Sequence, residues 1–377
     1  MNERAKQLLS GYAKIKIGLL GFNGPDPTND EFLGIPRATV MAFEEAWEAG
    51  LLPRRYELVF DPENGLPNGT AQNAINGYNR LVDQGCIVVL GAHSSDNAYA
   101  VAPVANARKV PLIGWPGTER FAGEYCFRLG NGDCGGDAEL IVSWVKRKGY
   151  KSVAVLLEIS PNSEEYFRFL QLSCRRHDIR IGALEITTQT PDDLSENLAR
   201  LKDAKCDAFV YLGYGQLLCQ GLMKEALDKI QWDPPRITTT AFMMYMFGHE
   251  LFDGWVGLDQ TCEDNPRTIA FRKRYEARFG EELELKDNPN WCCALHLLAY
   301  DGAQAVIEGL FRAPLLTGEG MKVGLERIRW VPTVTGGPRT HLSANPNEHN
   351  LFSGDWLTYA RMENGVIKYE GLLEACD

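Results

Sequence analysis

Hydroxyl groups follow two apolar, strand-like runs of the sequence and are its best candidates for binding chemistry. Ser94 and Ser95 come shortly after residues 87–90, and Thr118 comes shortly after residues 110–113. Hydroxyls and free backbone N–H groups at the start of a helix favour an anion. Ligands of open α/β sheets also bind in the crevice at the carboxyl ends of the strands. We therefore expect Ser95 and Thr118 to hold the charged end of a small ligand, unless these hydroxyls only cap helices.

His93 stands directly before the two serines and suggests a nucleophilic site at first sight. Its surroundings, GAHSSD, do not match the GxSxG turn that exposes a nucleophilic serine, and neighbours along such a turn point in different directions. We expect His93 to line or support a cleft and to take no part in catalysis. The six histidines are dispersed, and the adjacent pair Cys292 and Cys293 is not a CxxC motif, so no metal site is predicted.

The glycines after the first apolar run weakly resemble a dinucleotide site. Gly18, Gly21 and Gly24 are close together, but Pro25 and Pro27 force an extended loop before any helix starts. A GxGxxG turn must instead bring a helix N-terminus directly onto the pyrophosphate. We therefore expect no cofactor and no enzyme. A nucleotide-dependent or hydrolytic enzyme that uses the cleft stays as the alternative.

Strand-like runs alternate with amphipathic helices along most of the chain. One series of runs covers residues 14–21, 56–60, 87–90, 110–113 and 125–129, and a second series covers 152–157, 179–186, 208–212 and 236–240. Helical spacing of apolar residues separates most of these runs. Such alternation predicts α/β architecture, with two similar units in tandem, each a parallel sheet covered on both faces.

The last third of the chain lacks a full strand set of its own. A strand is expected at 254–258, helices near 267–279, 291–310 and 318–329, and a β-rich tail at 341–373. The tail contains a hairpin around Asn364 and Gly365, because Asn-Gly supplies the positive φ of a tight turn. Late helices without strands must cover a sheet built earlier. The chain is therefore expected to cross between lobes more than once.

Composition narrows the class of protein and its partners. The 377 residues are 45% hydrophobic and carry a formal net charge of -11, which argues against nucleic-acid binding. We expect no membrane insertion, because no apolar stretch is long enough to span a bilayer. The N-terminus lacks an export signal, so a cytoplasmic location is expected as written, and a periplasmic one if the chain was trimmed. Ten cysteines at irregular spacing fit a reducing compartment. A Cys126–Cys134 bridge stays open for an exported chain.

Six segments in a fixed order resemble the type I periplasmic binding protein family, in particular its leucine/isoleucine/valine-binding branch. They are IKIGLLGFNGP (15–25), FEEAWEAGLLPRRYELVFDPE (43–63), VVLGAHSSD (88–96), VPLIGWPGT (110–118), FVYLGYG (209–215) and AYDGAQAVIEGL (299–310). The resemblance implies two Rossmann-like lobes with parallel sheets, joined by a multi-strand hinge and closing like a flytrap around a small ligand.

The resemblance also implies where the chain passes between lobes. Crossings are expected near Gly130, near Gly254 and within residues 330–335. Lobe 1 would then hold 14–129 and 255–332, and lobe 2 would hold 130–254 and 333–377, with 1–13 as an N-terminal extension. An exported member would deliver its ligand to the permease of an ABC transporter. A cytoplasmic one would be closer to the amide sensor of the amidase operon, whose partner is a regulator protein.

Amino-acid-binding members hold the ligand carboxylate with a Ser after the third strand and an Ala/Thr pair after the fourth. These positions match Ser95 and, for the pair, Pro116 and Thr118. Their acidic residue for the ligand ammonium falls here near Ala241, which leaves an ammonium without a partner. Glu158 could substitute for it, cap the next helix or face solvent.

The other expected ligand contacts form the rest of the pocket. Trp115, Tyr214 and Phe242 predict an apolar, aromatic far wall opposite the anion end, unless the run 241–247 is ordinary core. Residues near Asn162 would close over the ligand from the second lobe. This pocket favours a small organic carboxylate or amide, aromatic or aliphatic, over a free α-amino acid. The expected function is reversible solute capture by closure of two lobes, for ABC-type import or intracellular sensing.

Overall fold

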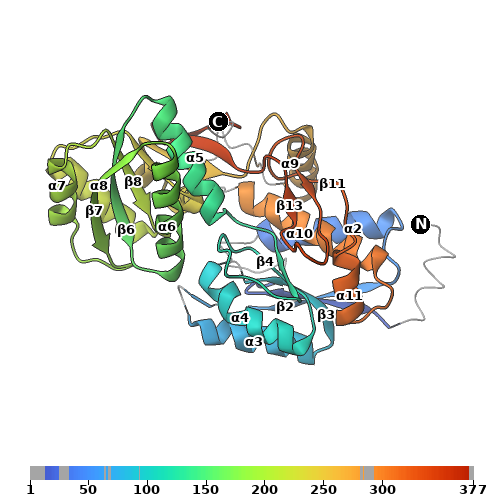
Figure 1. The fold of residues 1–377 in the computed structure, drawn as a ribbon. Helices are drawn as coiled ribbons and strands as arrows, with labels where there is room; N and C mark the ends of the chain where they lie inside the picture. Colours follow the sequence, from blue (N-terminus) through green and yellow to red (C-terminus); the bar gives the residue numbers. More distant parts are fainter. Residues whose placement is uncertain are drawn as a thin grey trace. The chain divides into compact units, whose positions relative to one another are not determined.

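Two separate sheets, each mainly parallel, organise the chain (Figure 1). The computed structural model describes residues 13–24, 34–62, 65–66, 69–92, 94–280, 283 and 293–372. The chain divides into two compact units. The first takes residues 1–131 and 295–356, and the second takes 132–294 and 357–377. This confirms the predicted fold class of two α/β lobes with parallel sheets.

The first unit contains a five-stranded sheet in the order β2-β1-β3-β4-β5, with every neighbouring pair parallel. Its strands are β1 (Ile15–Leu20), β2 (Tyr56–Asp61), β3 (Cys86–Gly91), β4 (Leu112–Gly114) and β5 (Cys126–Arg128). Most residues of β1, β3 and β4 are buried, as a sheet with helices on both faces requires.

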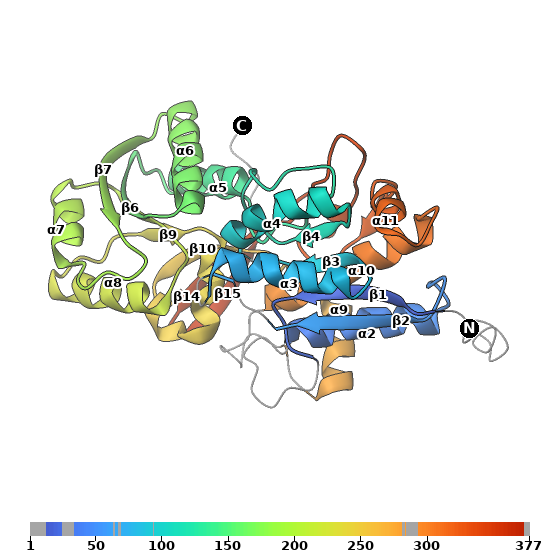
Figure 2. The same ribbon diagram turned by 90° about the horizontal axis from the view of Figure 1, so that it is seen from below.

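Helices cover both faces of this first sheet. On one face, α3 (Ala71–Asp83) and α4 (Ser95–Arg108) pack an apolar core against β1, β3 and β4. Figures 1 and 2 show α2 (Gly34–Glu48) and α10 (Cys293–Arg312) on the opposite face, where the Tyr300 hydroxyl donates to Glu45 at 2.6 Å. A further helix, α11 (Gly318–Leu325), follows α10. The late helices therefore cover a sheet built earlier, as predicted.

The end of the first unit adds a small antiparallel sheet of three short strands, β11 (Val331–Pro332), β12 (His341–Leu342) and β13 (Phe352–Ser353). Just before β13, Asn350 forms a parallel bridge with Arg128 at the end of β5. The Arg128 N–H donates to the His349 carbonyl at 2.8 Å, and the Leu351 N–H donates to the Arg128 carbonyl at 2.8 Å. This segment therefore extends the five-stranded sheet at its β5 edge.

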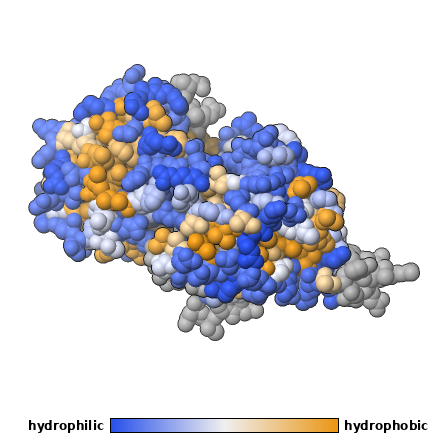
Figure 3. All heavy atoms as spheres, turned by 60° about the horizontal axis from the view of Figure 1, so that its bottom comes forward, coloured by the Kyte–Doolittle hydropathy of each residue, from blue (hydrophilic) through white to orange (hydrophobic). Residues whose placement is uncertain are grey.

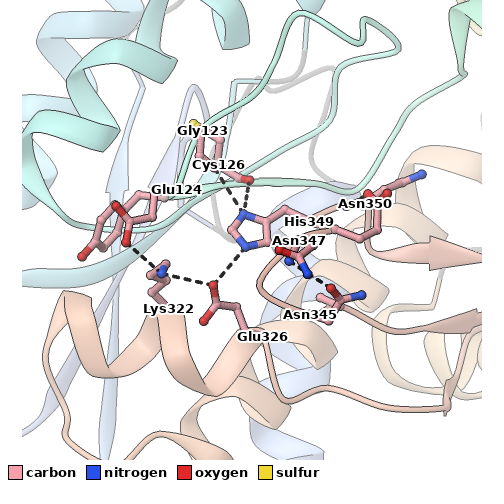
Figure 4. A network of polar contacts seen from close by, with 12 residues as sticks. Gly123, Glu124, Cys126, Lys322, Glu326, Asn345, Asn347, His349 and Asn350 are labelled. Carbon is pink, nitrogen blue, oxygen red and sulfur yellow. Dashed lines mark hydrogen bonds and ion pairs between the residues drawn. The ribbon is translucent and has the colours of Figure 1, made fainter.

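A polar network around His349 holds that segment in place (Figure 4). The Nδ1 atom lies 3.2 Å from the carbonyl oxygens of both Gly123 and Cys126, and Nε2 lies 3.1 Å from Oε1 of Glu326. Lys322 forms ion pairs with Glu326 at 3.1 Å and with Glu124 at 2.9 Å. The network ties the β5 region, the end of α11 and the tail of the unit together.

The second unit contains a seven-stranded sheet in the order β15-β14-β10-β9-β8-β6-β7. The parallel strands are β6 (Ser152–Glu158), β7 (Arg180–Thr187), β8 (Ala208–Leu212), β9 (Arg236–Thr238) and β10 (Trp255–Asp259). Two antiparallel strands, β14 (Thr358–Glu363) and β15 (Val366–Gly371), complete the sheet. Asn364 (φ 54°) and Gly365 (φ 72°) form the predicted hairpin turn between them.

Helices also cover both faces of the second sheet (Figure 1). On one face, α5 (Cys134–Arg147) and α6 (Pro161–Arg176) share an apolar core with β6, β8, β9 and β10. The other face carries α7 (Ser195–Asp203) and α8 (Leu217–Lys229). Two 3₁₀ helices, η1 (Thr240–Phe247) and η2 (His249–Phe252), join β9 to β10, and α9 (Pro266–Phe279) follows β10.

The predicted lobe boundaries need correction at two of three crossings. The chain passes from the first unit to the second after Asn131, but it returns only at Leu295 and leaves again after Trp356. Residues 255–294 were expected in lobe 1, yet β10 pairs with β9 and β14 of the second sheet. Residues 333–356 were expected in lobe 2. They belong to the first unit, where Asp301 of α10 accepts the N–H groups of residues 334 and 335 at 3.0 and 2.9 Å.

The possible Cys126–Cys134 bridge is wrong, because both are free thiols in different units. Cys126 lies near the Asn106 amide at 3.6 Å, and Cys134 donates to Asn162 at 3.5 Å. All seven cysteines whose side chains the structure describes are free. Burial raises the pKa of the Cys126 thiol to about 12, so it is protonated at neutral pH.

The visible face in Figure 3 is mainly hydrophilic, with apolar areas on both units. Among the exposed large apolar side chains of the second unit are Leu184 and Ile186, which lie on the edge strand β7. Among the described residues, no helix has the length and apolar character needed to cross a membrane.

Candidate ligand-binding site

The loop after β3 makes an abrupt turn that places Ser95 at the start of α4. Gly91 has φ 137°, and a Cβ atom there would lie 2.5 Å from the backbone oxygen of Leu20, so the end of β3 passes tightly against β1. Ala92 follows with φ 56°, an uncommon conformation for a residue with a side chain. His93 lies outside the described residues.

Two neighbouring serines at the start of α4 have different tasks. The Ser94 hydroxyl caps the helix by accepting the Asn97 N–H at 3.3 Å. The Ser95 hydroxyl accepts the N–H of Gly117 at 3.1 Å, from the loop that follows β4. Ser95 is therefore no helix cap. It joins the two loops at the carboxyl ends of β3 and β4, which is where the sequence predicts the anion end of the site.

Thr118 lies in the loop after β4, next to Gly117. Its hydroxyl accepts the N–H of Arg120 at 3.1 Å, and the side chain is buried. No helix begins here, contrary to the expected helix start: residues 115–125 form a loop that leads to β5, a parallel neighbour of β4. The structure thus brings Ser95 and the segment carrying Thr118 together at one edge of the first sheet.

Trp115 and Pro116 are buried within the same loop. The Trp115 ring centroid lies 5.7 Å from that of Phe22, and a Cβ on Gly302 of α10 would lie 3.7 Å from the indole nitrogen. That nitrogen has no hydrogen-bond partner among the described residues. The ring packs inside the first unit, in the same loop as Thr118, which corrects its predicted place in an aromatic wall opposite the anion end.

The predicted contacts of the second unit follow three neighbouring parallel strands. Asn162 comes after β6, Tyr214 after β8 and Ala241 after β9, and these strands are adjacent in the order β9-β8-β6. Their loops therefore lie at the same edge of the sheet. Two of them touch, since a Cβ on Gly215 would lie 2.7 Å from the Ala241 carbonyl oxygen. Asn162 is buried, whereas Tyr214 and Ala241 are half-buried.

Phe242 corrects the predicted apolar wall. Its side chain is 0% exposed and packs against Tyr245 and Phe252, with ring centroids 5.4 and 5.9 Å away. A Cβ on Gly257 of β10 would lie only 2.0 Å from the ring. The ring therefore fills the space that this glycine leaves, so Phe242 is a core residue of the second unit.

Glu158 neither caps a helix nor faces solvent, because Ser160 caps α6 and Glu158 is 0% exposed. It accepts the Tyr211 hydroxyl at 2.5 Å and also the backbone N–H of Tyr214. Burial raises its pKa. Tyr211 was not singled out from the sequence. The feature that could have indicated its role is a phenol within a buried strand, because such a hydroxyl needs a hydrogen-bond partner from a neighbouring strand.

A second buried acid lies near the start of the second unit. Asp137 on α5 accepts the N–H and the hydroxyl of Thr240, both at 3.0 Å, and the Tyr166 hydroxyl at 3.0 Å. Burial raises its pKa to about 6. Gly132 packs so closely on this cluster that a Cβ would lie 2.0 Å from the Thr240 hydroxyl. The acid therefore fixes the start of the unit against the loop after β9.

No group of three or more His, Cys, Asp or Glu side chains in the described part of the chain could hold a metal ion.

Comparison with a family model gives a match over residues 14–358, and the model is described as periplasmic binding protein. A search of curated protein sequences gives no match. Structural similarity to solved proteins is extensive at low identity. A type 1 periplasmic binding protein from Bordetella pertussis superposes with a TM-score of 0.77 at 19% identity, covering 95% of this chain and 99% of the other.

Two further similar structures contain ligands. The branched-chain amino acid transporter substrate-binding protein of Streptococcus pneumoniae, in complex with isoleucine, has a TM-score of 0.76 at 20% identity and covers 95% of this chain and 98% of its own. A solute-binding protein of an ABC transporter from Rhodopseudomonas palustris, in complex with 3,4-dihydroxybenzoic acid, has a TM-score of 0.72 at 18% identity, with coverages of 97% and 98%. Because the family model spans nearly the whole chain, this protein belongs to the periplasmic binding protein family and is a solute-binding protein.

Proposed function

We propose that this protein reversibly binds a small organic carboxylate or amide, leaves it chemically unchanged, and passes it to the permease of an ABC transporter. The observation that carries the proposal is the hydrogen bond from Gly117 to Ser95, which joins the loops after β3 and β4. It puts hydroxyls and backbone N–H groups of two loops at the carboxyl edge of one parallel sheet. Such an edge suits the oxygen atoms of a carboxylate or amide.

The second unit supports a ligand without an ammonium group. Ala241 stands where an acid would be needed, and Glu158 is buried with Tyr211 as its partner. Neither residue offers an exposed carboxylate to a cation. The similar protein from Rhodopseudomonas palustris was solved with an aromatic acid, 3,4-dihydroxybenzoic acid, and this supports the same ligand class here.

Capture requires that the solute contact both units. Residues Asn162, Tyr214 and Ala241 provide the second unit's edge, and Ser95 and Thr118 provide the first. A solute that bonds to both edges shifts the equilibrium toward the arrangement in which both reach it. A solute with equal affinity for every arrangement would shift nothing.

The test begins with the solute that copurifies. Native mass spectrometry of the protein, followed by denaturation and identification of the released molecule, is expected to give a small acid or amide. Calorimetric titration should then show binding of benzoate or benzamide with higher affinity than leucine. Recovery of the same molecule, unchanged after incubation, is expected. An affinity for leucine above that of every acid and amide in the panel would overturn the ligand class, and turnover would overturn the function.

Intracellular sensing with a regulator protein as partner is a second candidate. The free state of all seven described cysteines favours it, because unpaired thiols fit a reducing compartment. Fractionation of the source cells decides between the candidates. Recovery with the periplasmic fraction supports import, and recovery with the cytoplasmic fraction supports sensing.

A further inference from the structure

One buried acid, Glu158, and its hydrogen-bond partners hold the loop that carries Tyr214. This loop connects β8 to α8 and consists of residues 213–216. Glu158, the last residue of the neighbouring strand β6, accepts the backbone N–H of Tyr214 in the middle of this loop. It also accepts the hydroxyl of Tyr211 at 2.5 Å, just before the loop begins.

The same hydrogen-bonded chain continues to the other end of the loop. The Tyr211 hydroxyl lies 3.7 Å from the sulfur of Cys219, in the first turn of α8. Glu158, Tyr211 and Cys219 are all buried. The chain Glu158–Tyr211–Cys219 therefore connects β6, β8 and α8 directly around the loop.

Two glycines let the loop lie directly on these groups. A Cβ on Gly213 would lie 2.2 Å from the Tyr211 hydroxyl and 2.6 Å from Oε2 of Glu158. Gly215 has φ 68° and abuts the carbonyl oxygen of Ala241. A side chain at either position would push the loop away from its support.

One oxygen of the acid is left over. Oε1 of Glu158 is buried and has no hydrogen-bond partner among the described residues, although a buried carboxylate is costly to leave partly unsatisfied. An acid kept in this environment points to a task that an apolar residue could not perform. Accepting two donors from the β8 strand and loop is that task.

We propose that Glu158 is a positioning residue for solute recognition: it fixes the 213–216 loop and thereby the place of Tyr214, without touching the solute. This inference rests on the proposed function only for the role of Tyr214. The geometry of the loop stands independently of any ligand. An acid that bound the solute directly would instead need an exposed oxygen, and Glu158 is 0% exposed.

The test compares two variants that differ in one property. Glu158→Gln keeps an acceptor oxygen for Tyr211 and Tyr214, and its amide takes the place of the unpartnered oxygen. Glu158→Leu keeps the approximate size but removes the acceptor. Hydrogen exchange of the peptide covering residues 213–217 is measured in the absence of solute. Glu158→Leu should exchange about tenfold faster there, and Glu158→Gln should stay near the wild-type rate.

A matched control is Glu139→Gln, which alters an acid on α5 that accepts the Ser173 hydroxyl at 2.7 Å, at a different place in the second unit. It should leave exchange at 213–217 unchanged. Thermal unfolding confirms that each variant is folded. If Glu158→Leu does not fold, Tyr211→Phe removes one donor of the same chain and should accelerate exchange in the same peptide.

Solute affinity then separates positioning from contact. With benzoate as the probe, Glu158→Leu should bind about tenfold more weakly and Glu158→Gln within about threefold of wild type. Unchanged exchange in a folded Glu158→Leu would overturn the inference. Equal loss of affinity in both variants with unchanged exchange would also overturn it, by making Glu158 a direct contact. If wild type binds none of the acids and amides tested, including the copurifying solute, the proposed function fails, while the exchange result still decides the role of Glu158.

Discussion

The proposed recognition edges of the two units, the loops after β3 and β4 in the first and after β6, β8 and β9 in the second, lie on similar parallel sheets but are held together by different groups. In the first unit, backbone N–H groups and hydroxyls connect the loops, as in the bond from Gly117 to Ser95. In the second unit, buried acids connect the loops, as Glu158 does for Tyr211 and Asp137 does for Thr240. The second edge therefore keeps its acids buried. The difference teaches that a buried acid can support the loops of a proposed binding edge, while the groups proposed to meet the solute, such as Ser95, Thr118 and Tyr214, are neutral.

Phe242→Ala should cause the largest loss of stability, and it tests whether Phe242 belongs to the core of the second unit. The fully buried ring packs on Gly257, so its removal leaves a cavity and should cost about 3–5 kcal/mol in the free energy of unfolding. Urea denaturation measures this loss. Phe311→Ala is the control, because that ring is 68% exposed and should cost less than about 0.5 kcal/mol. A small loss of stability combined with a large loss of solute affinity would show that Phe242 lines the ligand pocket instead.

Each unit also contains a buried aspartate, and the two should affect stability over different pH ranges. Burial raises the pKa of Asp301 in the first unit to about 7 and that of Asp137 in the second to about 6. A raised pKa means that the folded state holds the proton more tightly than the unfolded state. This contribution to stability is therefore fully present below about pH 4 and is lost as pH rises through the folded pKa.

Asp301→Asn should remove the contribution of Asp301. From pH 5 to pH 8, wild type should lose roughly 2–3 kcal/mol in the free energy of unfolding relative to this variant, measured by urea denaturation. For Asp137→Asn the corresponding change from pH 5 upward should be smaller, about 1 kcal/mol, and should be complete by about pH 7. A difference that is constant with pH for Asp301→Asn would show that this aspartate is ionised in the folded protein throughout the range.

The smallest effects concern the two helix caps at the recognition edges. Ser94 accepts the Asn97 N–H at 3.3 Å in the first unit, and Ser160 accepts the Ser163 N–H at 3.0 Å in the second. Ser94→Ala and Ser160→Ala should each cost about 1 kcal/mol of stability, read from thermal unfolding. Neither should weaken solute binding as much as Ser95→Ala. A larger loss of solute affinity in Ser94→Ala than in Ser95→Ala would show that the capping hydroxyl of Ser94 binds the solute instead.

Most of the architecture was predictable, because the length of an apolar run and the spacing of apolar residues indicate whether a segment is a strand or a helix. Short apolar runs bounded by glycines and helical spacing between them predicted the parallel strands from β1 to β9, and Asn364-Gly365 predicted the hairpin. The boundaries between the lobes were harder to predict from the sequence. The run that became β10 has the same pattern whichever sheet it joins, and only its pairing with β9 and β14 decides its unit.

For the candidate site, the sequence predicted the shared sheet edge of Ser95 and Thr118 but not the support of the second unit's loops. Ser95 and Thr118 follow adjacent strands, so the strand order brings their loops together. Phe242 was ambiguous, because an apolar run looks the same in a core and in a pocket wall. The partnership of Glu158 and Tyr211 depends on β6 and β8 being neighbours, although β7 lies between them in the sequence. Sequence spacing alone does not contain that adjacency.

The central claim is that hydroxyls of the first unit anchor the solute. Calorimetric titration of Ser95→Ala and Thr118→Val with the copurifying solute tests it most directly, with Ser173→Ala as a control hydroxyl on α6. The account predicts a loss of about 1–3 kcal/mol in binding free energy for each of the first two variants and none for the control. Wild-type affinity in both variants would contradict it.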